Sequence, residues 1–314
     1  MHVTTLLDVS RLPEVAFVGG VIDRAAHRRT DPDLLGTLLA DPGTRVVEMS
    51  GEGFAVGDDD RLLLRAPLPS DRDADLLVFL GEGGGKGAVS TAYVLVVSSP
   101  AEVQPPRPVL GLRELAAGLD PDLASLVATS LGLANWHRNH PRCSRCGAVT
   151  EPRLGGWIRR CPRDGSEHYP RTDVAVIMAV TDGADRLLLG RAPAWPEGRM
   201  SILAGFVEPG ETLEQAVARE VREEVGIEVR DVEYVADQPW PFPSSLMVGF
   251  TARAVQTDLV LDPAEIAEAR WVSREDVRAL IAAGLYRPSP GFSISRALVE
   301  DWFGGPLPSA PAAP

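Results

Sequence analysis

Apolar residues recur at every fourth position between residues 213 and 225, which is the spacing of one face of an α-helix. This apolar stripe consists of Leu213, Val217, Val221 and Val225. Thr212 and Gln215 have the spacing of a capping box, and Gly226 is the usual kind of residue just past a helix end. The pattern therefore predicts a helix that begins near Leu213 and ends before Gly226.

Shorter apolar runs, cut by Gly, Pro and Asp, predict strands in the first hundred residues. These runs cover residues 45–49, 62–64, 76–80 and 92–97. The glycine-rich segment 83–87 lacks the spacing of a Walker phosphate loop, so a flexible hairpin turn is the better interpretation. We therefore expect a mostly β N-terminal domain with little chemistry of its own.

The rest of the chain alternates between helical and strand patterns. Residues 100–108 resemble a proline-rich linker, and residues 112–138 predict two helices broken near Asp120. Farther along, strands are expected at 174–180, 186–191, 246–252 and 269–272, with helices at 274–283 and 294–303. The expected domains are 1–108 (β domain with linker), 109–140 (helical connector), 141–169 (a small module that contains the three cysteines), 170–303 (α/β domain) and 304–314 (disordered tail).

Composition fits a globular protein of two or three units, with 314 residues and 45% hydrophobic content. A net charge of −13 argues against nucleic-acid binding through the whole surface, although it permits one basic patch. The start of the chain lacks the pattern of a signal peptide, and no apolar run reaches the roughly 20 residues of a membrane helix. With three cysteines, two of them in Cys-x-x-Cys, the expected location is the cytoplasm.

The cysteines have the spacing of a zinc ribbon, with Cys143 and Cys146 in one knuckle and Cys161 in the other. The usual place of a fourth ligand, near Cys161, holds Asp164. An aspartate can bind zinc through oxygen, and His168 or His140 are alternatives to it. A ribbon that holds its shape without metal is the other interpretation.

Arginines concentrate around this module and would form a local basic patch suited to a polyphosphate or to the first phosphates of an RNA. They are Arg138, Arg142, Arg145, Arg153, Arg159, Arg160, Arg163 and Arg171. Ordinary surface arginines are an equally good explanation.

Three glutamates, Glu220, Glu223 and Glu224, lie beside the apolar stripe of the helix predicted at 213–225. Like charges at such spacing repel by about a few tenths of a kcal/mol per pair, so they contribute nothing to helix stability. A hard divalent cation with oxygen ligands would reverse the sign of that interaction. The sequence therefore favours a metal site here over a merely solvated acidic face.

A second stretch, residues 238–245, alternates prolines with two aromatic residues. Proline fixes the backbone dihedral φ, so the segment is stiff and extended, and it presents Trp240 and Phe242 for stacking on a planar base. The competing interpretation is a proline-rich ligand for another protein, which the position inside a predicted α/β domain, and not in a tail, disfavours.

The spacing Gly205, Glu211 and Arg219–Ile227 resembles the complete Nudix box. With the array at 238–245 and the cysteine module, the chain resembles the NADH pyrophosphatase family of Nudix hydrolases from about Arg113 to Ala297. The chain departs from that family's pattern at two positions, which hold Asp237 and Asp164. The resemblance implies a Nudix α/β/α sandwich preceded by a zinc-ribbon-like module and a mostly β domain.

The resemblance also implies hydrolysis of the pyrophosphate of NAD(H) to nicotinamide mononucleotide and AMP, removal of NAD caps from RNA 5′ ends, and a homodimer. Glu220 and Glu224 match the metal-binding carboxylates, with Glu223 beside them. Glu265 matches a further ligand for Mg²⁺ or Mn²⁺, and Ala204 would offer its backbone carbonyl. The implied substrate contacts are Tyr169, Arg113, Ser295, Gln238, Pro239, Trp240, Pro241, Phe242, Pro243, Ser244 and Ser245.

We expect the metal ions to neutralise the pyrophosphate and to orient a water for in-line attack at phosphorus, with Glu224 as the base. Arg219 is expected to orient a glutamate through a charged hydrogen bond. Two alternatives remain at this level. One is a Nudix hydrolase of another substrate such as ADP-ribose, and the other is a non-catalytic zinc-ribbon protein that binds RNA.

Overall fold

The computed structural model describes residues 12, 15–20, 22–83, 90–98 and 108–309. The glycine-rich turn predicted at 83–87 and the linker predicted at 100–108 lie almost wholly outside these ranges. The chain forms two compact units, each described by itself below. The C-terminal unit holds Asp173–Pro239 and Ser245–Pro314 with Met1–Ala16, and the N-terminal unit holds Phe17–Thr172 and Trp240–Ser244.

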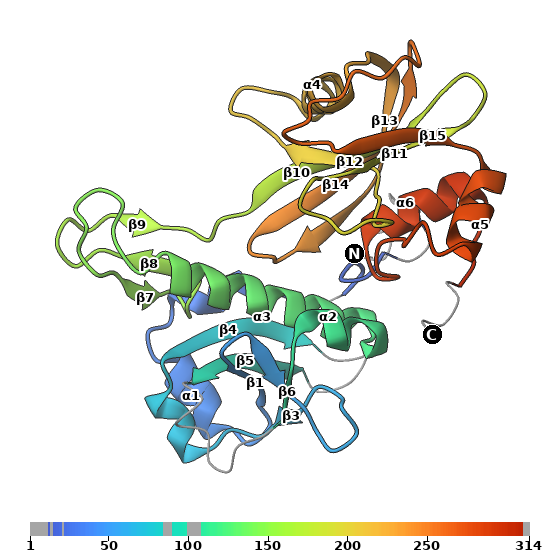
Figure 1. Ribbon diagram of the computed structural model, residues 1–314. Helices are drawn as coiled ribbons and strands as arrows, with labels where there is room; N and C mark the ends of the chain where they lie inside the picture. Colours follow the sequence, from blue (N-terminus) through green and yellow to red (C-terminus); the bar gives the residue numbers. More distant parts are fainter. Residues whose placement is uncertain (1–11, 13–14, 21, 84–89, 99–107, 310–314) are drawn as a thin grey trace, which may run out of the picture. The chain divides into compact units, whose positions relative to one another are not determined.

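The C-terminal unit is built on a mixed six-stranded sheet (Figure 1) with the order β13-β14-β10-β11-β15, and β12 pairs with β10. In chain order the strands are β10 (Asp173–Thr181), β11 (Leu187–Arg191), β12 (Leu203–Phe206), β13 (Val229–Trp240), β14 (Ser245–Ala254) and β15 (Glu268–Val272). The central strand β10 runs parallel to β14 and antiparallel to β11 and β12. The strands predicted for this region are confirmed, whereas β12 and β13 were not predicted.

Successive side chains of β10 point to opposite faces, and both faces are covered by helices. Val176 and Met178 pack in the cluster that includes helix α4 (Leu213–Val225). Ile177 and Ala179 pack in the cluster that includes α5 (Arg274–Ala282) and α6 (Ile294–Phe303). The two helical layers are visible on either side of the sheet in Figure 1, so the predicted α/β/α sandwich is confirmed.

Helix α4 begins and ends where its sequence signals place it. The Thr212 hydroxyl accepts a hydrogen bond from the Gln215 amide at 3.3 Å, and the Gln215 side chain accepts from the Thr212 amide at 2.8 Å. Gly226 closes the helix with φ of 72°, a left-handed conformation that glycine adopts without strain. Val217, Val221 and Val225 are fully buried, each worth about 1.5–3 kcal/mol of apolar transfer free energy.

The N-terminal unit contains a second six-stranded sheet with the order β4-β5-β1-β2-β6, and β3 pairs with β1. Its strands are β1 (Arg45–Ser50), β2 (Gly53–Ala55), β3 (Leu64–Arg65), β4 (Leu76–Gly83), β5 (Thr91–Ser98) and β6 (Val109–Leu110). Helix α1 (Leu34–Ala40), which was not predicted, packs Leu34 and Leu38 against this sheet. The mostly β character predicted for this region is confirmed.

Two helices follow, as predicted, with the break at Asp120. The short helix α2 (Leu112–Leu115) precedes α3 (Pro121–Asn139). The Asp120 carboxylate accepts a hydrogen bond from the Leu123 amide at 3.0 Å, and proline occupies the first helical position, where its missing N–H costs nothing. Most of α3 is buried, so it serves as a rigid support for its neighbours in the N-terminal unit.

The cysteine module is a small three-stranded sheet, β7 (Glu151–Arg153), β8 (Ile158–Arg160) and β9 (Glu167–His168). A buried network joins it to α3. His137 Nε2 lies 2.7 Å from the Gly156 carbonyl oxygen, and His137 Nδ1 lies 2.8 Å from the Arg159 guanidinium. A carbonyl only accepts and a guanidinium only donates, so the proton sits on Nε2 and the imidazole is neutral. Burial lowers the pKa of His137 to about 4, in agreement with this assignment.

Two further observations complete the fold. Leu307, within the segment predicted to be a disordered tail, is buried in the core of the C-terminal unit, and its amide donates to Glu300 at 2.9 Å. Across the described ranges, none of the helices has the length and apolar character needed to cross a membrane.

Candidate active site and metal centres

Helix α4 and a neighbouring loop bring three glutamates together. Carboxylate oxygens of Glu220, Glu224 and Glu265 all lie within 4.8 Å of one another. Glu220 and Glu224 are buried, and Glu265 is exposed. Oε2 of Glu224 is buried and has no hydrogen-bond partner among the residues that the structure describes. A buried acceptor without a donor costs free energy, and a bound cation or a water at this oxygen would remove that cost.

Glu265 belongs to this cluster because its loop is bonded to the end of α4. The Asp262 amide donates to the carbonyl of Glu224 at 3.1 Å, and the Val260 amide donates to the carbonyl of Val225 at 2.9 Å. Asp262 then accepts from the Glu265 amide at 3.1 Å and closes a turn. These bonds use carbonyls that a helix end leaves unpaired.

Gly205 on β12 leaves the space that the Glu220 carboxylate occupies. A Cβ atom at this position would lie 1.9 Å from Cδ of Glu220. No side chain fits there, so the glycine of the box is explained by the glutamate that packs against it.

The concentration of negative charge perturbs the glutamates. Burial raises the pKa of the Glu224 carboxyl to about 8, and the charges of Glu220 and Glu265 add to the shift. Burial also raises the pKa of Glu220, although the Arg219 guanidinium opposes this. A divalent cation would remove the repulsion among these groups, and hard cations such as Mg²⁺ prefer oxygen ligands of this kind. The residues present therefore fit a divalent metal site.

Arg219 fixes the surroundings of the cluster. Its guanidinium donates to both oxygens of Glu211 at 2.6 and 2.9 Å and to Glu220 at 2.8 Å. It also donates to Glu223 at 3.0 Å and to the carbonyl of Phe206 at 2.8 Å. The predicted orienting role of Arg219 agrees with these bonds. Glu223, by contrast, is exposed and lies outside the three-residue cluster.

Ala204 precedes Gly205 on β12, where it is opposite Ile177 of β10 and exposed. The Ala204 backbone therefore adjoins Gly205, which packs against the Glu220 carboxylate. This is consistent with the predicted use of its carbonyl as a metal ligand.

The proline-rich array divides between the two units. Gln238 is fully buried in the C-terminal unit, where its side-chain amide donates to the carbonyls of Ala16 and Phe292 at 2.9 and 2.8 Å. Its side-chain oxygen accepts from the Ile294 amide at 2.8 Å. The described contacts of Gln238 are therefore structural. Its predicted contact with substrate stays a prediction.

Trp240 and Phe242 belong to the N-terminal unit, and their rings meet edge to face with centroids 5.1 Å apart. The Arg113 guanidinium lies over both rings, 4.4 Å from the centroid of Phe242 and 5.9 Å from that of Trp240. Arg113 and Phe242 line a cavity of about 730 Å³. The structure thus brings the predicted phosphate contact and the predicted stacking residues together.

Asn135 of α3 holds the backbone of this array. Its amide nitrogen donates to the carbonyl of Pro241 at 3.1 Å and to that of Pro243 at 3.2 Å, and its oxygen accepts from Arg138 at 2.6 Å. Buried carbonyls need donors, and in this segment, where the prolines supply no N–H groups of their own, the Asn135 side chain is the donor.

The other predicted substrate contacts differ in accessibility. Tyr169 is 64% exposed and donates to Glu167 at 3.0 Å. Pro239 is exposed and Pro241 is buried. Ser244 and Ser245 are half-buried. Ser295 is buried at the start of α6, and its hydroxyl lies 2.8 Å from that of Ser201 and 3.1 Å from that of Ser289.

The two knuckles of the cysteine module have the same backbone hydrogen bonds. In the first, the Cys143 amide donates to Ala148 at 2.8 Å and the Cys143 carbonyl accepts from Gly147 at 2.9 Å. In the second, Cys161 makes the same pair of bonds with Ser166 and Gly165, at 2.9 and 3.0 Å. The equivalence places Asp164 where the first knuckle has Cys146.

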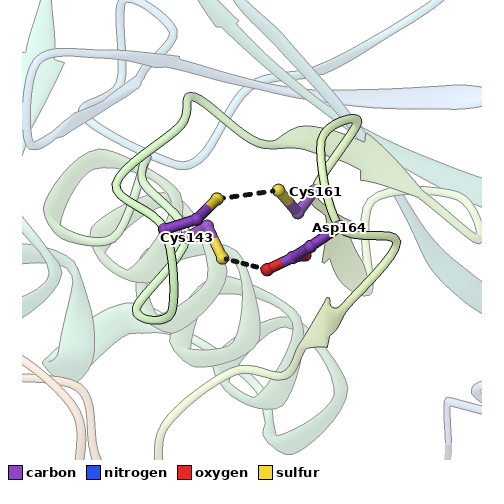
Figure 2. Close-up of side chains that lie close together, drawn as sticks. Cys143, Cys161 and Asp164 are labelled. Carbon is purple, nitrogen blue, oxygen red and sulfur yellow. Dashed lines mark hydrogen bonds between the residues drawn. The ribbon is translucent and has the colours of Figure 1, made fainter.

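Figure 2 shows the side chains of Cys143, Cys161 and Asp164 pointing toward one another. The Cys143 sulfur lies 3.6 Å from Oδ2 of Asp164, and the Cys146 and Cys161 sulfurs are 3.5 Å apart as free thiols. Zinc–sulfur bonds of about 2.3 Å in a tetrahedron separate two sulfurs by roughly 3.7 Å. The four side chains therefore fit a zinc ion.

Within the described chain, the metal-ligand atoms that cluster here belong to Asp164 and the three cysteines, not to His168 or His140. Ser166 donates to Oδ1 of Asp164 from its amide at 2.9 Å and from its hydroxyl at 2.6 Å. These bonds lower the pKa of Asp164 and leave Oδ2 directed at the sulfurs. The hydroxyl of Ser166 also lowers the pKa of Cys143, whereas burial raises that of Cys161.

The predicted arginine patch needs one correction. Arg159 is buried, and it donates to His137 at 2.8 Å and to the Thr150 hydroxyl at 2.7 Å. It is therefore a structural residue and does not belong to a surface patch.

Two residues of the site were missed by sequence reasoning. Phe206 is 59% exposed on β12, next to Gly205. Asn135 lies on the buried side of α3. An apolar residue in the box and an asparagine in a helix give no signal of exposure or of bonding to a distant segment, so only the folded structure reveals them.

Comparisons with known proteins agree with this geometry. A NUDIX domain matches residues 171–291, and an NADH pyrophosphatase zinc ribbon domain matches residues 138–169. The NAD-capped RNA hydrolase NudC of Mycobacterium bovis (strain BCG / Pasteur 1173P2) is 40% identical over 93% of this chain and 95% of its own. The NAD-capped RNA hydrolase NudC of Stutzerimonas stutzeri (strain A1501) is 38% identical over 86% of this chain and 91% of its own. Human NAD-capped RNA hydrolase NUDT12 is 41% identical over 64% of this chain and 45% of its own.

The box glutamates, the cysteine module and the similarity over nearly the whole length agree with one another. The chain therefore belongs to the NudC family, the zinc-ribbon NADH pyrophosphatases among the Nudix hydrolases.

Proposed function

We propose that this enzyme hydrolyses the diphosphate bond of NAD(H) to nicotinamide mononucleotide and AMP, and removes NAD caps from RNA 5′ ends. The observation that carries the proposal is the cluster of Glu220, Glu224 and Glu265 within 4.8 Å, in a chain of the NudC family. The named relatives are NAD-capped RNA hydrolases, which supports the same substrate class here.

Mg²⁺ or Mn²⁺ is the cofactor that this cluster would hold. Glu220, Glu224 and Glu265 would be ligands through their carboxylates, with the Ala204 carbonyl as a further oxygen and Glu223 beside them. When bound, such an ion neutralises diphosphate charge and lowers the pKa of a water ligand. Arg219 keeps Glu220 in place through the 2.8 Å charged hydrogen bond.

Glu224 is the proposed general base. Its Oε2 has no partner in the described structure, so a lone pair is available to accept the proton of the attacking water. Without a metal, burial raises its pKa to about 8, and a bound divalent cation would lower that pKa and keep Glu224 ionised as the base requires. The water attacks phosphorus in line with the departing phosphate oxygen, and Glu224 takes up the proton released.

We propose that exposed or half-buried aromatic rings recognise the nucleotide. Phe206 offers a ring face on the strand that contacts Glu220. Trp240 and Phe242 are held by Asn135 and covered in part by Arg113, whose guanidinium is suited to phosphate. Tyr169 and Ser295 remain proposed substrate contacts.

Substrate preference tests the proposal. We expect kcat/KM for NADH to exceed that for ADP-ribose by at least about tenfold, because ADP-ribose lacks the second base available for stacking. An equal or higher value for ADP-ribose would assign the enzyme to another Nudix activity. Comparing free NADH with NAD-capped RNA at the same Mn²⁺ concentration then ranks the two proposed substrates.

Three further properties belong to this proposal. The cysteine module would hold a structural Zn²⁺ through Cys143, Cys146, Cys161 and Asp164. The enzyme would act as a homodimer, which sedimentation equilibrium would measure. Its location would be the cytoplasm, in keeping with the three free cysteines.

A further inference from the structure

A second cavity, of about 410 Å³, lies within the N-terminal unit and shares no residue with the proposed active site. Its walls come from the segment around α1, from β4 and from the ribbon strands β7, β8 and β9. The volume is within the range of about 300–1,000 Å³ that small-molecule sites have. Neither the proposed reaction nor the zinc site uses this cavity.

The inner wall of the cavity is apolar. Leu34 and Ile158 are 2% and 4% exposed and line it, together with Leu35 and Leu77. Such a surface stacks or packs against the body of an organic ligand, whereas a site for a bare inorganic ion needs only polar groups.

Two arginines that form no ion pair within the described chain line the same cavity. Arg29 and Arg160 line it, and neither has an ion-pair partner among the residues described. Nε of Arg29 is buried and has no hydrogen-bond partner in the described chain. The Arg29 guanidinium does donate to the carbonyl of Arg24 at 2.9 Å, through Nη2.

Arg24 adds a second positive charge beside Arg29. Their guanidiniums lie 5.6 and 3.7 Å from the ring centroid of Trp157, so one indole packs against two cations. Burial lowers the pKa of both arginines, and the charge of Arg24 lowers that of Arg29 further. Two partly buried like charges destabilise the free protein, and a bound anion would offset that cost.

The cavity also contains two carboxylates and a third arginine. Asp31 accepts from the Asp33 amide at 2.9 Å, and Glu167, which is opposite Arg160 between β8 and β9, accepts from the Tyr169 hydroxyl at 3.0 Å. Arg153 is paired with Glu151, two residues earlier on β7. Of the three arginines that line the cavity, Arg29 and Arg160 therefore have guanidiniums that are not ion-paired in the described chain and can bind an anion.

We propose that this cavity binds a phosphate monoester with an organic body, of the size of a nucleoside monophosphate. The phosphate would be held by Arg29 and Arg160, whose planar forks of N–H donors match phosphate oxygens. The organic body would pack on Leu34, Leu35, Leu77 and Ile158. The proposal is independent of the reaction at the glutamate cluster.

Calorimetric titration in the presence of a chelator tests the site, because the chelator removes the ions through which a nucleotide would bind at the glutamates. The probes are AMP, adenosine and inorganic phosphate, each titrated into the full-length protein. We expect AMP to bind and adenosine to bind at least about tenfold more weakly, since it lacks the charged hydrogen bonds. Phosphate should bind more weakly than AMP because it lacks the packing body.

Two variants locate the binding, and a third is the matched control. Arg29→Gln and Arg160→Gln should each raise the Kd of AMP at least about tenfold. Arg61→Gln makes the same charge change at an arginine whose side chain is 83% exposed and lies outside the cavity, so it should leave the Kd unchanged. Thermal unfolding of each variant identifies any loss of fold, and Arg160, which is exposed, keeps the test valid if Arg29→Gln unfolds.

Three results would overturn the proposal. AMP could fail to bind the wild-type protein in chelator at millimolar concentration. Its Kd could be the same in both cavity variants as in wild type. A 5′-hydroxyl oligoribonucleotide could bind through Arg29 and Arg160 where AMP does not, which would make this face an RNA surface instead.

Discussion

Glu224 is distinguished from the other glutamates of its helix by an orphaned buried oxygen. Glu220 is bonded to Arg219, and Glu223 is exposed and bonded to the same guanidinium, whereas Oε2 of Glu224 has no partner in the described chain. At the scale of single residues, the chemistry therefore depends most on Glu224. Two predictions follow from its environment.

The first concerns turnover. Glu224→Gln keeps the shape of the side chain and removes its charge and basicity, so kcat should fall by about 10²–10⁴-fold with the fold intact. The matched control is Glu223→Gln on the same helix, which should lose much less because Glu223 lies outside the cluster. Steady-state kinetics with NADH measures both. Equal losses in the two variants would contradict the assignment of the base.

The second concerns pH. Because the pKa of Glu224 is raised to about 8 from an ordinary value of 4.5, the fold favours its protonated form. The associated stability is fully present below pH 4.5 and is lost as pH rises through about 8. In the presence of chelator, the Tm should therefore decrease as the pH is raised from 5.5 to 8.5. Added Mn²⁺ should increase the Tm more at pH 8.5 than at pH 5.5.

Other groups titrate in the same range, so the informative comparison is with Glu224→Gln, which has no carboxyl at this position. Its Tm should depend less on pH than that of the wild type, by differential scanning fluorimetry in chelator. Parallel curves for the two proteins would show that Glu224 does not titrate in this window.

Sequence reasoning reached some of these residues and not others, for physical reasons. The proximity of Glu220 and Glu224 could be predicted because the period of a helix places residues four apart on the same edge. Glu265 was reached through the family resemblance, since its position depends on hydrogen bonds from its loop to the end of α4. The exposure of Phe206 follows from neighbours distant in the chain, so no local pattern predicts it.

At the scale of elements, the zinc ribbon is held together by two equivalent knuckles. The matching hydrogen bonds of Cys143 and Cys161 make Asp164 the counterpart of Cys146. This equivalence is a property of backbone geometry, and the sequence alone left Asp164, His168 and His140 open. The same geometry leads to the third prediction.

Zinc content should depend on Asp164 and not on His168. The purified protein should carry about one zinc ion per chain. Asp164→Ala should lower this occupancy and the Tm, whereas Asp164→Cys should retain both and His168→Ala should retain the metal. Elemental analysis by mass spectrometry measures the content. Retention in Asp164→Ala together with loss in His168→Ala would reverse the ligand assignment.

The fourth prediction concerns the support of the aromatic array by α3. Asn135→Leu removes both hydrogen bonds to the proline carbonyls, with an expected cost of about 1–3 kcal/mol in unfolding free energy. Because Trp240 and Phe242 lose their fixed position, KM for NADH should rise roughly tenfold with a smaller change in kcat. Here Asn135 acts as a positioning residue.

Thr129→Val is the control, since Thr129 lies on the same helix, does not line the 730 Å³ cavity and donates its hydroxyl to the Ser125 carbonyl within the helix. It should leave KM unchanged. If Asn135→Leu lowered the Tm but left KM at its wild-type value, the residue would be structural only. Intrinsic tryptophan fluorescence on NADH addition gives a second measure of the array.

Elements were predicted well where a local signal defines both ends. Helix α4 has a capping box and a terminal glycine, and α3 has Asp120 with a following proline, so both begin where the sequence indicates. Strand β12 was missed because its pairing with β10 depends on a partner distant in the chain. Strand β13 pairs with β14, the next strand along the chain, but its buried and exposed residues do not alternate, so it carries no strand pattern. The short ribbon strands were missed because two or three residues carry no period.

At the scale of the whole molecule, different chemistry resides in different units. The C-terminal unit contains the acidic cluster, and the N-terminal unit contains the cysteine module, the aromatic array and the arginine-lined cavity. The sequence showed this division through its motifs, but it assigned the whole array to the catalytic domain. The structure instead places Trp240–Ser244 with the N-terminal unit because Asn135 bonds their carbonyls.

The most direct test of the whole account is identification of the products formed from NADH by the purified protein with Mg²⁺ or Mn²⁺. Hydrolysis of the diphosphate predicts equal amounts of AMP and reduced nicotinamide mononucleotide, resolved by liquid chromatography and mass spectrometry. The reaction should stop in chelator and in Glu224→Gln. Unchanged NADH, or release of a nicotinamide base with ADP-ribose through cleavage of the glycosidic bond, would contradict the account.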